Sequence, residues 1–209
     1  EAQAGVPWAS LVEHCVEHDL HGLENLAGIP GTVGASPVQN VGAYGVEAKD
    51  VIHLVRAYDV RTGELRVFTP RECRFGYRDS VFKHELAGRY IIASVIYRLN
   101  REYTPNLDYR ALAIAVGQRG YSHPTARQVA DTVVALRDSK LPNPKEIGSA
   151  GSFFKNPVVT ASHRDMLLRR YPKIVAFEVD EEHYKLAAGW LIEQCGWKGR
   201  GLGRAGVYE

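Results

Sequence analysis

The stretch "LHGLENLAGIPGTVGASPVQNVGAYGVE", residues 20–47, decides how this 209-residue chain folds. It is too glycine-rich for a long helix and too apolar for a disordered linker. Glycine lets main-chain N–H groups approach a ligand closely, because no Cβ stands in the way. The stretch has neither the GK[ST] of a Walker loop nor a GxGxxG fingerprint after a strand. By composition alone, a ligand-binding loop and a tightly packed structural turn are equally good interpretations.

Separated helices and hairpins flank this stretch on both sides. Upstream, apolar spacing predicts a helix over residues 7–20, with Pro7 in its first turn. Downstream, alternating residues predict a hairpin over 51–70 around the turn "RTGE", and a β-branched run predicts a strand over 89–99. Further helices are expected at 125–142, between a Thr125 cap and Pro142, at 162–172, and at 184–197, ending at Gly196. This mixture is typical of the α+β class, and the prolines and charges near 140–148 indicate a domain boundary.

Charge and composition exclude several classes of function. A formal net charge of +2, without runs of like charge, argues against a nucleic-acid or membrane-surface partner. No apolar stretch approaches the roughly 18 residues that span a bilayer. The three cysteines, Cys15, Cys73 and Cys195, lack metal-ligand spacing, so we expect reduced, buried thiols and no structural metal.

The two ends indicate an internal fragment. The chain begins "EAQAGVPWASL" without an initiator Met and stops at "GRGLGRAGVYE", a glycine-rich turn leading into the start of a strand.

Two further motifs carry residues suited to chemistry. In "RFGYRDS", Arg78 offers a permanently charged planar fork that suits a carboxylate, although most arginines are surface or structural residues. In "SAGSFFKNP", residues 149–157, Ser152 stands between Gly151 and Phe153. It is either a turn cap or a proton donor whose dry wall is Phe153 or Phe154, with Lys155 or Lys140 supplying a cation. It is not a hydrolase nucleophile, because GxSxG is absent.

Four blocks, in order, resemble the UDP-N-acetylenolpyruvoylglucosamine reductase family: residues 22–47, "ECRFGYRDSVFK", "SAGSFFKNP" and "KLAAGWLIEQC". The resemblance runs over essentially the whole chain. It implies a FAD-binding fold of the vanillyl-alcohol-oxidase type plus a smaller α+β substrate-binding domain. Residues 1–141 resemble the second FAD-binding subdomain, the first being absent, and 142–209 resemble a truncated substrate-binding domain without the family's C-terminal catalytic glutamate.

The resemblance also implies roles for individual residues. Arg78 would stabilise the negative charge of the reacting group, and Ser152 would donate the proton. The implied substrate-binding residues are Tyr77, Tyr109, Lys140, Asn156 and Lys185. The implied cofactor-binding residues are Pro30, Gly31, Gly34, Ala35, Ser36, Gln39, Asn40, Gly42 and Ala43. One departure is Ser149, where the family commonly has Asn.

The activity implied is reduction of the enolpyruvyl group of UDP-N-acetylglucosamine enolpyruvate to UDP-N-acetylmuramate, with FAD as cofactor and NADPH as co-substrate. Such an enzyme would be cytoplasmic, monomeric at full length, and inactive as this fragment alone. Two alternatives remain: another FAD-linked oxidase of the same superfold, and a non-catalytic UDP-sugar-binding module. A yellow full-length protein that oxidises NADPH with the enolpyruvyl substrate would exclude the second.

Overall fold

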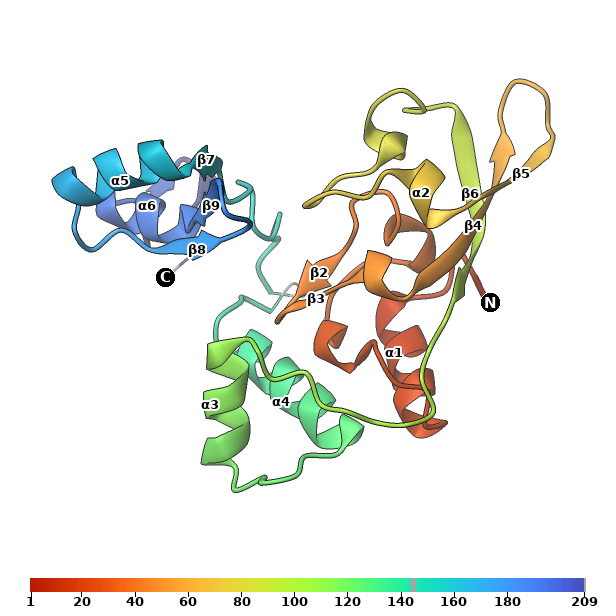
Figure 1. Ribbon diagram of the computed structural model, residues 1–209, viewed down its shortest axis with the longest axis horizontal. Coiled ribbons are helices and arrows are strands. Elements are labelled where there is room, and N and C mark those ends of the chain that lie inside the picture. The colour runs from red at the N-terminus through yellow and green to blue at the C-terminus, as the bar shows by residue number, and fades with distance from the viewer. Residues whose placement is uncertain (144–145, 209) are drawn as a thin grey trace. The chain divides into compact units, whose positions relative to one another are not determined.

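The computed structural model describes residues 1–143 and 146–208. The chain divides into two compact units, Glu1–Lys140 and Leu141–Glu209, which we call unit 1 and unit 2. Each unit combines helices with antiparallel strands (Figure 1), so the α+β class expected from the sequence is confirmed.

Unit 1 is built on a four-stranded antiparallel sheet with strand order β1-β6-β4-β5. The strands of this sheet are β1 Ala2–Gln3, β4 Ile52–Asp59, β5 Leu65–Phe68 and β6 Tyr90–Tyr97. A separate hairpin consists of β2 Gly42–Ala43 and β3 Val46–Glu47. The predicted 51–70 hairpin and 89–99 strand are therefore confirmed. In β4, the inward-facing residues Val55, Ala57 and Asp59 alternate with more exposed ones, the period expected of a strand with one buried face.

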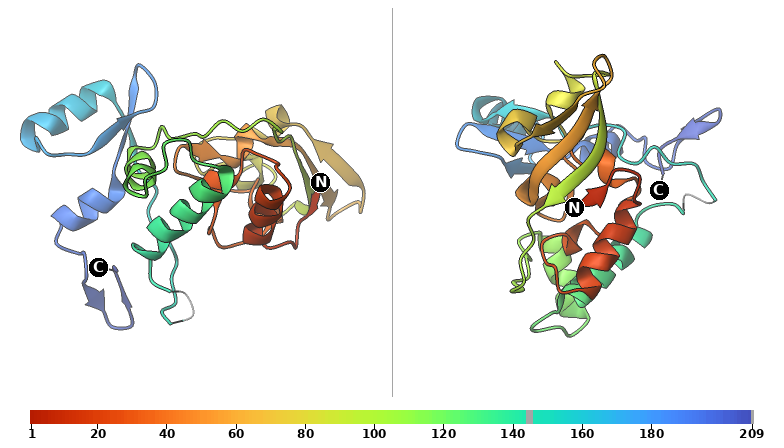
Figure 2. Two further views of the ribbon diagram at one scale, coloured as in Figure 1. Left: turned by 90° about the horizontal axis from the view of Figure 1, so that it is seen from below. Right: turned by 90° about the vertical axis from the view of Figure 1, so that its right-hand side faces the viewer.

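The helices of unit 1 are α1 Trp8–Glu17, α2 Pro70–Cys73, α3 Arg110–Gln118 and α4 Ala126–Asp138. Figures 1 and 2 show α1 and α4 side by side, away from the β4–β5 hairpin. Thr125 caps α4 as predicted, because its side chain accepts a hydrogen bond from the N–H of Gln128. The helix ends at Asp138, four residues before Pro142, so proline is not its direct stop signal. The sequence patterns did not identify α3.

The core of unit 1 joins α1 to the sheet and to the 20–47 stretch. Trp8 is almost fully buried, and its indole N–H donates to the carbonyl of Leu26 at 2.9 Å. Cys15 and Cys73 lie in this core, where burial raises the pKa of the Cys15 thiol to about 11 and that of Cys73 to about 12. Both thiols therefore stay protonated at neutral pH, as expected of buried structural cysteines.

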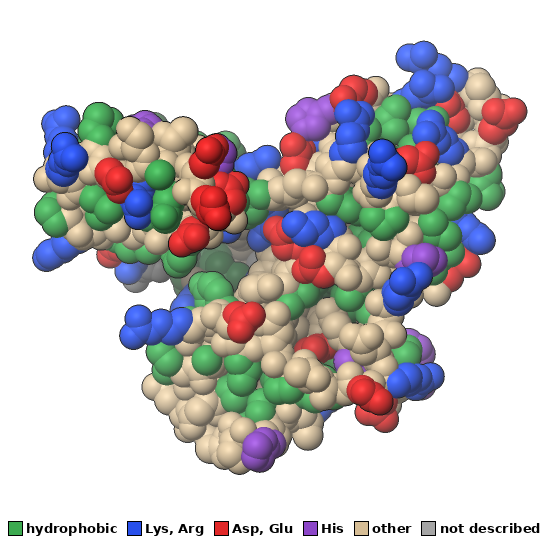
Figure 3. All heavy atoms as spheres, in the orientation of Figure 1, with side chains coloured by type: hydrophobic (Ala, Val, Ile, Leu, Met, Phe, Trp, Pro, Cys, Tyr) green, Lys and Arg blue, Asp and Glu red, His purple; other side chains and the backbone are tan. Residues whose placement is uncertain are grey.

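Unit 2 is smaller and centres on a three-stranded antiparallel sheet with strand order β7-β9-β8. Its elements are β7 Val158–Thr160, α5 Ala161–Arg170, β8 Ala176–Glu178, β9 His183–Leu186, α6 Ala188–Gln194, β10 Gly201–Leu202 and β11 Ala205–Gly206. Among the described residues of unit 2, the buried hydrophobic ones are Ile174, Leu186 and Ala188. Figure 3 shows acidic side chains gathered on the edge of this unit where β8 and β9 lie.

Two predictions for the C-terminal region were wrong. The expected helix over 184–197 begins only at Ala188, because residues 184–186 belong to strand β9, in which Tyr184 and Lys185 pair with both β7 and β8 and Leu186 pairs with β8. Sheet pairing thus overrides the apolar helical pattern at the start of this segment. Cys195 is exposed, since it follows the last turn of α6 on the solvent side.

Within residues 1–143 and 146–208, no helix is long and apolar enough to cross a membrane. In the same residues, no group of three or more His, Cys, Asp or Glu side chains is arranged to hold a metal ion.

Candidate active site

Arg78 lies on a tight turn between α2 and the 3₁₀ helix Val81–Lys83. Gly76 and Asp79 close this turn with two backbone hydrogen bonds, which leaves Tyr77 and Arg78 at its tip. The φ of Arg78 is +54°, a left-handed conformation that non-glycine residues rarely adopt. Lys83 Nζ donates to the Arg78 carbonyl at 2.9 Å, and the Arg78 guanidinium lies 5.1 Å from the centre of the Tyr77 ring. The turn is therefore built to hold Arg78 in one unusual orientation.

The Arg78 guanidinium reaches back to the β2–β3 hairpin. Its Nη2 donates to the Gly42 carbonyl, and its Nη1 lies 3.4 Å from both the Asn40 carbonyl and Glu47 Oε1. A Cβ at position 42 would come within 2.6 Å of Nη1. A larger residue at position 42 would therefore displace the guanidinium, which lies directly against the backbone.

The glycine stretch folds as consecutive turns held by its own backbone. The N–H groups of Val33 and Gly34 donate to the carbonyls of Val6 and Ala4, and those of Ala35 and Ser36 donate to Thr32 and Val33. A Cβ at position 34 would lie 2.7 Å from the Ala4 side chain. The expected free N–H groups are therefore already used at residues 33–36, and Gly34 is explained by packing.

The nine predicted cofactor residues fall into three groups by exposure. Pro30, Gly31, Ala35 and Gln39 are exposed, and Gly34, Gly42 and Ala43 are half-buried. Ser36 and Asn40 are buried, with side chains bonded inside the protein. Ser36 Oγ donates to the Val33 carbonyl and lies 2.8 Å from the Tyr97 hydroxyl, while Asn40 Nδ2 donates to the Gly76 carbonyl at 2.8 Å.

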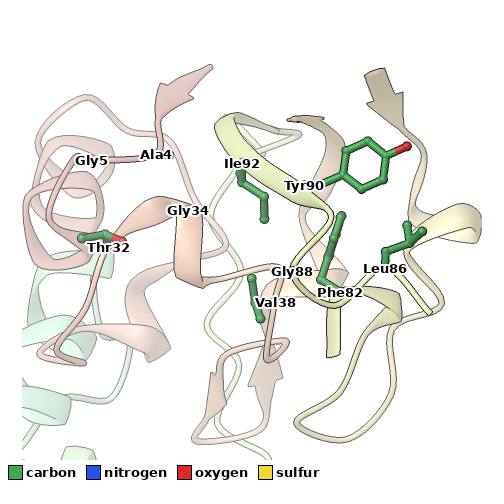
Figure 4. Close-up of a pocket in the computed structure, with 10 residues that line it drawn as sticks. All are labelled: Ala4, Gly5, Thr32, Gly34, Val38, Phe82, Leu86, Gly88, Tyr90 and Ile92. Atoms are coloured by element: carbon green, nitrogen blue, oxygen red, sulfur yellow. The ribbon is translucent and has the colours of Figure 1, made fainter. Parts of the chain in front are cut away.

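A hollow of about 520 Å³ opens beside Gly34 (Figure 4). Phe82, Leu86, Tyr90 and Ile92 form its apolar wall, while the backbone of Ala4 and Gly5 lies on the opposite side with Thr32. Gly34 alone among the predicted cofactor residues lines it. The wall residues were missed from the sequence. Two of them could have been predicted from the alternation of side chains along β6, which puts Tyr90 and Ile92 on one face of the strand.

Tyr109 is the N-cap residue of α3 and is 42% exposed. Its ring packs edge-to-face on Tyr44, with centroids 5.3 Å apart. Asn25 fixes both segments, because its buried amide donates to the carbonyls of Tyr44 at 2.8 Å and Asn106 at 2.9 Å. Burial raises the pKa of Tyr44 above its ordinary value. Lys140 is exposed just beyond α4, and its backbone N–H donates to Arg137.

In unit 2, Ser152 occupies an exposed loop that leads into β7. The loop bends at Gly151, whose φ is +65° and whose N–H donates to Ser149 Oγ at 3.1 Å. The rings of Phe153 and Phe154 stack edge-to-face but are 79% and 61% exposed. The expected dry wall is therefore not formed around Ser152 by the described residues. Ser152 is accessible rather than packed.

Asn156 and Lys185 lie on the framework that carries this loop. Asn156 Oδ1 accepts from the Ala188 N–H at 2.9 Å, at the start of α6. Lys185 lies in β9, opposite Val158 of β7. The predicted residues thus form two sets: Tyr77, Arg78, Tyr109 and Lys140 in unit 1, and Ser152, Asn156 and Lys185 in unit 2.

Two family models match separate parts of the chain. Residues 143–209 match the family model described as UDP-N-acetylenolpyruvoylglucosamine reductase, C-terminal domain. Residues 1–69 match the model described as FAD binding domain.

Curated relatives match the whole chain. UDP-N-acetylenolpyruvoylglucosamine reductase from Ralstonia nicotianae is 52% identical over 208 residues, which cover 100% of this chain and 61% of the relative. The reductase from Neisseria meningitidis is 53% identical over 210 residues, with the same coverages. The crystal structure of the Thermus caldophilus reductase has a TM-score of 0.63 at 26% identity, covering 98% of this chain and 56% of that one. Over its whole length the chain is therefore similar to UDP-N-acetylenolpyruvoylglucosamine reductases, and it spans about three fifths of the length of the curated relatives it matches.

Proposed function

We propose that the protein carrying this chain is an NADPH-dependent flavoenzyme that reduces UDP-N-acetylglucosamine enolpyruvate to UDP-N-acetylmuramate, in peptidoglycan precursor synthesis. The observation that carries this proposal is the identity of about half the residues, along the whole chain, with curated reductases of that name. Conservation of fold alone would not suffice, because one fold hosts many activities. The arrangement of Arg78 and the accessibility of Ser152 support the same reaction.

Unit 1 has features that fit a flavin. The hollow beside Gly34 has a volume within the roughly 300–1,000 Å³ typical of ligand pockets, and one wall is apolar and aromatic, as a flat ring system requires. The exposed residues Pro30, Gly31, Ala35 and Gln39 would border the cofactor, and Gly31 has open space where a Cβ would lie. Bound FAD, once reduced by NADPH, would supply the hydride that adds to the enolpyruvyl double bond.

Residues of this chain would stabilise the negative charge that develops on the substrate and would donate the proton. Hydride addition to one carbon of the double bond places negative charge on the neighbouring carbon and its carboxylate. Arg78 would hold this charge, because a guanidinium is a permanent cation with a fork of N–H donors. Ser152 would then give its proton to the charged carbon. Tyr77, Tyr109, Lys140, Asn156 and Lys185 would bind the substrate around these two groups.

Each unit takes one part of this task in our proposal. Residues 1–141 would form the second FAD-binding subdomain, and residues 142–209 the substrate-binding domain. We place the full-length enzyme in the cytoplasm, as a monomer.

The decisive experiment uses the purified full-length protein. It should carry bound flavin that NADPH reduces, and NADPH oxidation beyond one equivalent of flavin should require the enolpyruvyl UDP-sugar, with UDP-N-acetylmuramate as product. Flavin absorbance, NADPH absorbance and product mass are the three readouts. A protein that binds the UDP-sugar without oxidising NADPH would instead be a binding module, and the proposal would be wrong.

A further inference from the structure

The Arg78 guanidinium is bonded on one side only. It has five N–H donors, and its contacts to Asn40, Gly42 and Glu47 use both hydrogens of Nη1 and one of Nη2. Among residues 1–143 and 146–208, the hydrogen bonds of the Arg78 side chain are made by Nη1 and Nη2 and not by Nε. The N–H of Nε and the second N–H of Nη2 can therefore donate two parallel hydrogen bonds to a carboxylate. The direction in which the Nε edge of the guanidinium points depends on the groups that hold its opposite, Nη1 side.

Glu47 is the charged group on that opposite side. Its Oε1 lies 3.4 Å from Arg78 Nη1, and its Oε2 accepts from Asn40 Nδ2 at 3.0 Å and from Lys49 Nζ at 2.8 Å. The Glu47 side chain is about three quarters buried. Both oxygens are therefore held, so Glu47 has little freedom to follow a moving guanidinium.

Asn40 connects this carboxylate to the Arg78 turn. It is fully buried with a φ of +43°, and its Nδ2 bonds both Glu47 Oε2 and the Gly76 carbonyl at the start of the turn. Its Oδ1 accepts from the Lys49 N–H at 2.9 Å. A strained, buried amide that joins two segments in this way fixes their relative positions.

We infer that Glu47 is a positioning residue for Arg78: it orients the guanidinium so that the Nε edge faces the substrate carboxylate. This inference rests on the proposed function. The competing interpretation is purely structural, because Glu47 also caps the 3₁₀ helix Ala48–Asp50. The two interpretations differ in whether the effect of Glu47 on the reaction passes through Arg78.

The first test measures how fast the enolpyruvyl substrate reoxidises the reduced flavin in the full-length protein. Glu47→Gln should slow this step by about tenfold to a hundredfold, by analogy with the loss when the hydrogen-bond partner that orients a metal ligand is removed. Reduction of the flavin by NADPH should keep its rate. In an Arg78→Ala background, adding Glu47→Gln should have no further effect, because the group it orients is gone. An equal slowing in both backgrounds, or none in either, would overturn the inference.

A second variant protects against misfolding. Glu47→Asp keeps the negative charge and a good helix cap but is one methylene too short to reach Arg78. It should fold normally and still slow reoxidation; reoxidation at the unmodified rate would count against positioning. Glu64→Gln is the matched control, since Glu64 is an exposed acid in the β4–β5 turn and its loss should leave the rate unchanged.

A readout without catalysis completes the test. Nitrogen-15 NMR of arginine side chains in the full-length protein should show slow rotation of the Arg78 guanidinium, which becomes fast in Glu47→Gln. Unchanged rotation would refute the inference even if the enzyme slows. If the unmodified full-length protein fails to reduce the substrate at all, the proposed function is wrong, whereas the NMR result still decides whether Glu47 holds Arg78.

Discussion

At the residue scale, Asn156 and Ser152 lie four positions apart on one loop but have different surroundings. Asn156 is half-buried and its amide oxygen is bonded to the first turn of α6, so it ties the loop to the framework. Ser152 is exposed between two exposed phenylalanines and a glycine. A loop held at its end but open at its serine is suited to presenting a hydroxyl to a substrate.

For Ser152→Ala in the full-length protein, we expect reoxidation of the flavin by substrate to slow by about 10²–10⁴-fold, the range for general acid catalysis. Substrate affinity should change less than roughly tenfold, because one hydroxyl contributes about 0.5–1.5 kcal/mol. Ser152→Cys should recover part of the rate, since a thiol is a better acid of similar size. Ser149→Ala is the matched control and should have a far smaller effect. Stopped-flow flavin absorbance measures each rate, and a wild-type rate in Ser152→Ala would make Ser152 a loop residue only.

For Arg78→Ala, turnover should fall by about 10²–10³-fold, as when one donor to a developing negative charge is lost. The NADPH half-reaction should survive, because the flavin is reduced before the substrate reacts. Arg74→Ala, at an exposed arginine paired with Glu85 on the same segment, should leave both half-reactions intact. Equal loss of both half-reactions in Arg78→Ala, observed by rapid-mixing absorbance, would show that Arg78 supports the fold or the flavin instead.

At the element scale, the sheet of unit 1 contains a buried acid where β4 ends and β6 begins. Asp59 accepts from the Arg61 N–H at 2.9 Å and pairs with the Arg89 guanidinium at 2.9 Å. The hydrogen bond from the Arg61 backbone, followed by those from Arg89, lowers the pKa of Asp59 below its ordinary value. The ionised form of Asp59 is thus the one that stabilises the junction of the β4–β5 turn with β6.

This pairing predicts a pH dependence of stability. Because the folded-state pKa is lowered, the contribution of Asp59 is fully present above its unfolded value of about 3.9 and is lost as the pH falls through the folded-state pKa. Asp59→Asn should be less stable at pH 7 but should lose less stability between pH 5 and pH 2, both values being approximate limits of that window. Urea unfolding followed by circular dichroism checks this. The control is Asp138→Asn, which removes an exposed acid on α4 and should lose as much stability over this pH range as the unmodified chain.

At the scale of the whole molecule, the two units differ in how much core they have. Unit 1 buries an extensive apolar cluster around Trp8, Phe68 and Val95, while the described part of unit 2 buries far less. A small domain with little buried apolar surface is only marginally stable. The hollow beside Gly34 in unit 1 is open and has an apolar wall on one side only.

We therefore expect the 209-residue chain alone to bind FAD weakly or not at all, since it spans only about three fifths of its relatives. Its exposed apolar surface should also favour association. Equilibrium dialysis against FAD and light scattering measure these two properties, with the full-length protein as the positive control. Recovery of the chain as a soluble protein with one FAD per molecule would show that residues 1–209 already contain the complete flavin site.

Features that depend on local pattern and on family motifs could be predicted from the sequence. The alternation of 51–70 and 89–99 gave the central hairpin and strand, Thr125 marked the start of α4, and four motif blocks identified the family. These features follow from neighbouring residues, so no knowledge of distant contacts is needed. The candidate residues Arg78 and Ser152 came from the same motifs.

The contacts that support these residues could not be predicted from the sequence and are known from the folded structure. Asn40, Glu47 and Gly42 converge on Arg78 across more than thirty residues of sequence, and Asn25 joins Tyr44 to Asn106. Gly34 is explained by the overlap that a Cβ at this position would make with Ala4. Tyr184 and Lys185 lie in strand β9, although their sequence pattern predicted a helix. These contacts form only when distant segments of the chain come together in the fold. Hydrogen-bond partners and packing space therefore cannot be read from sequence spacing.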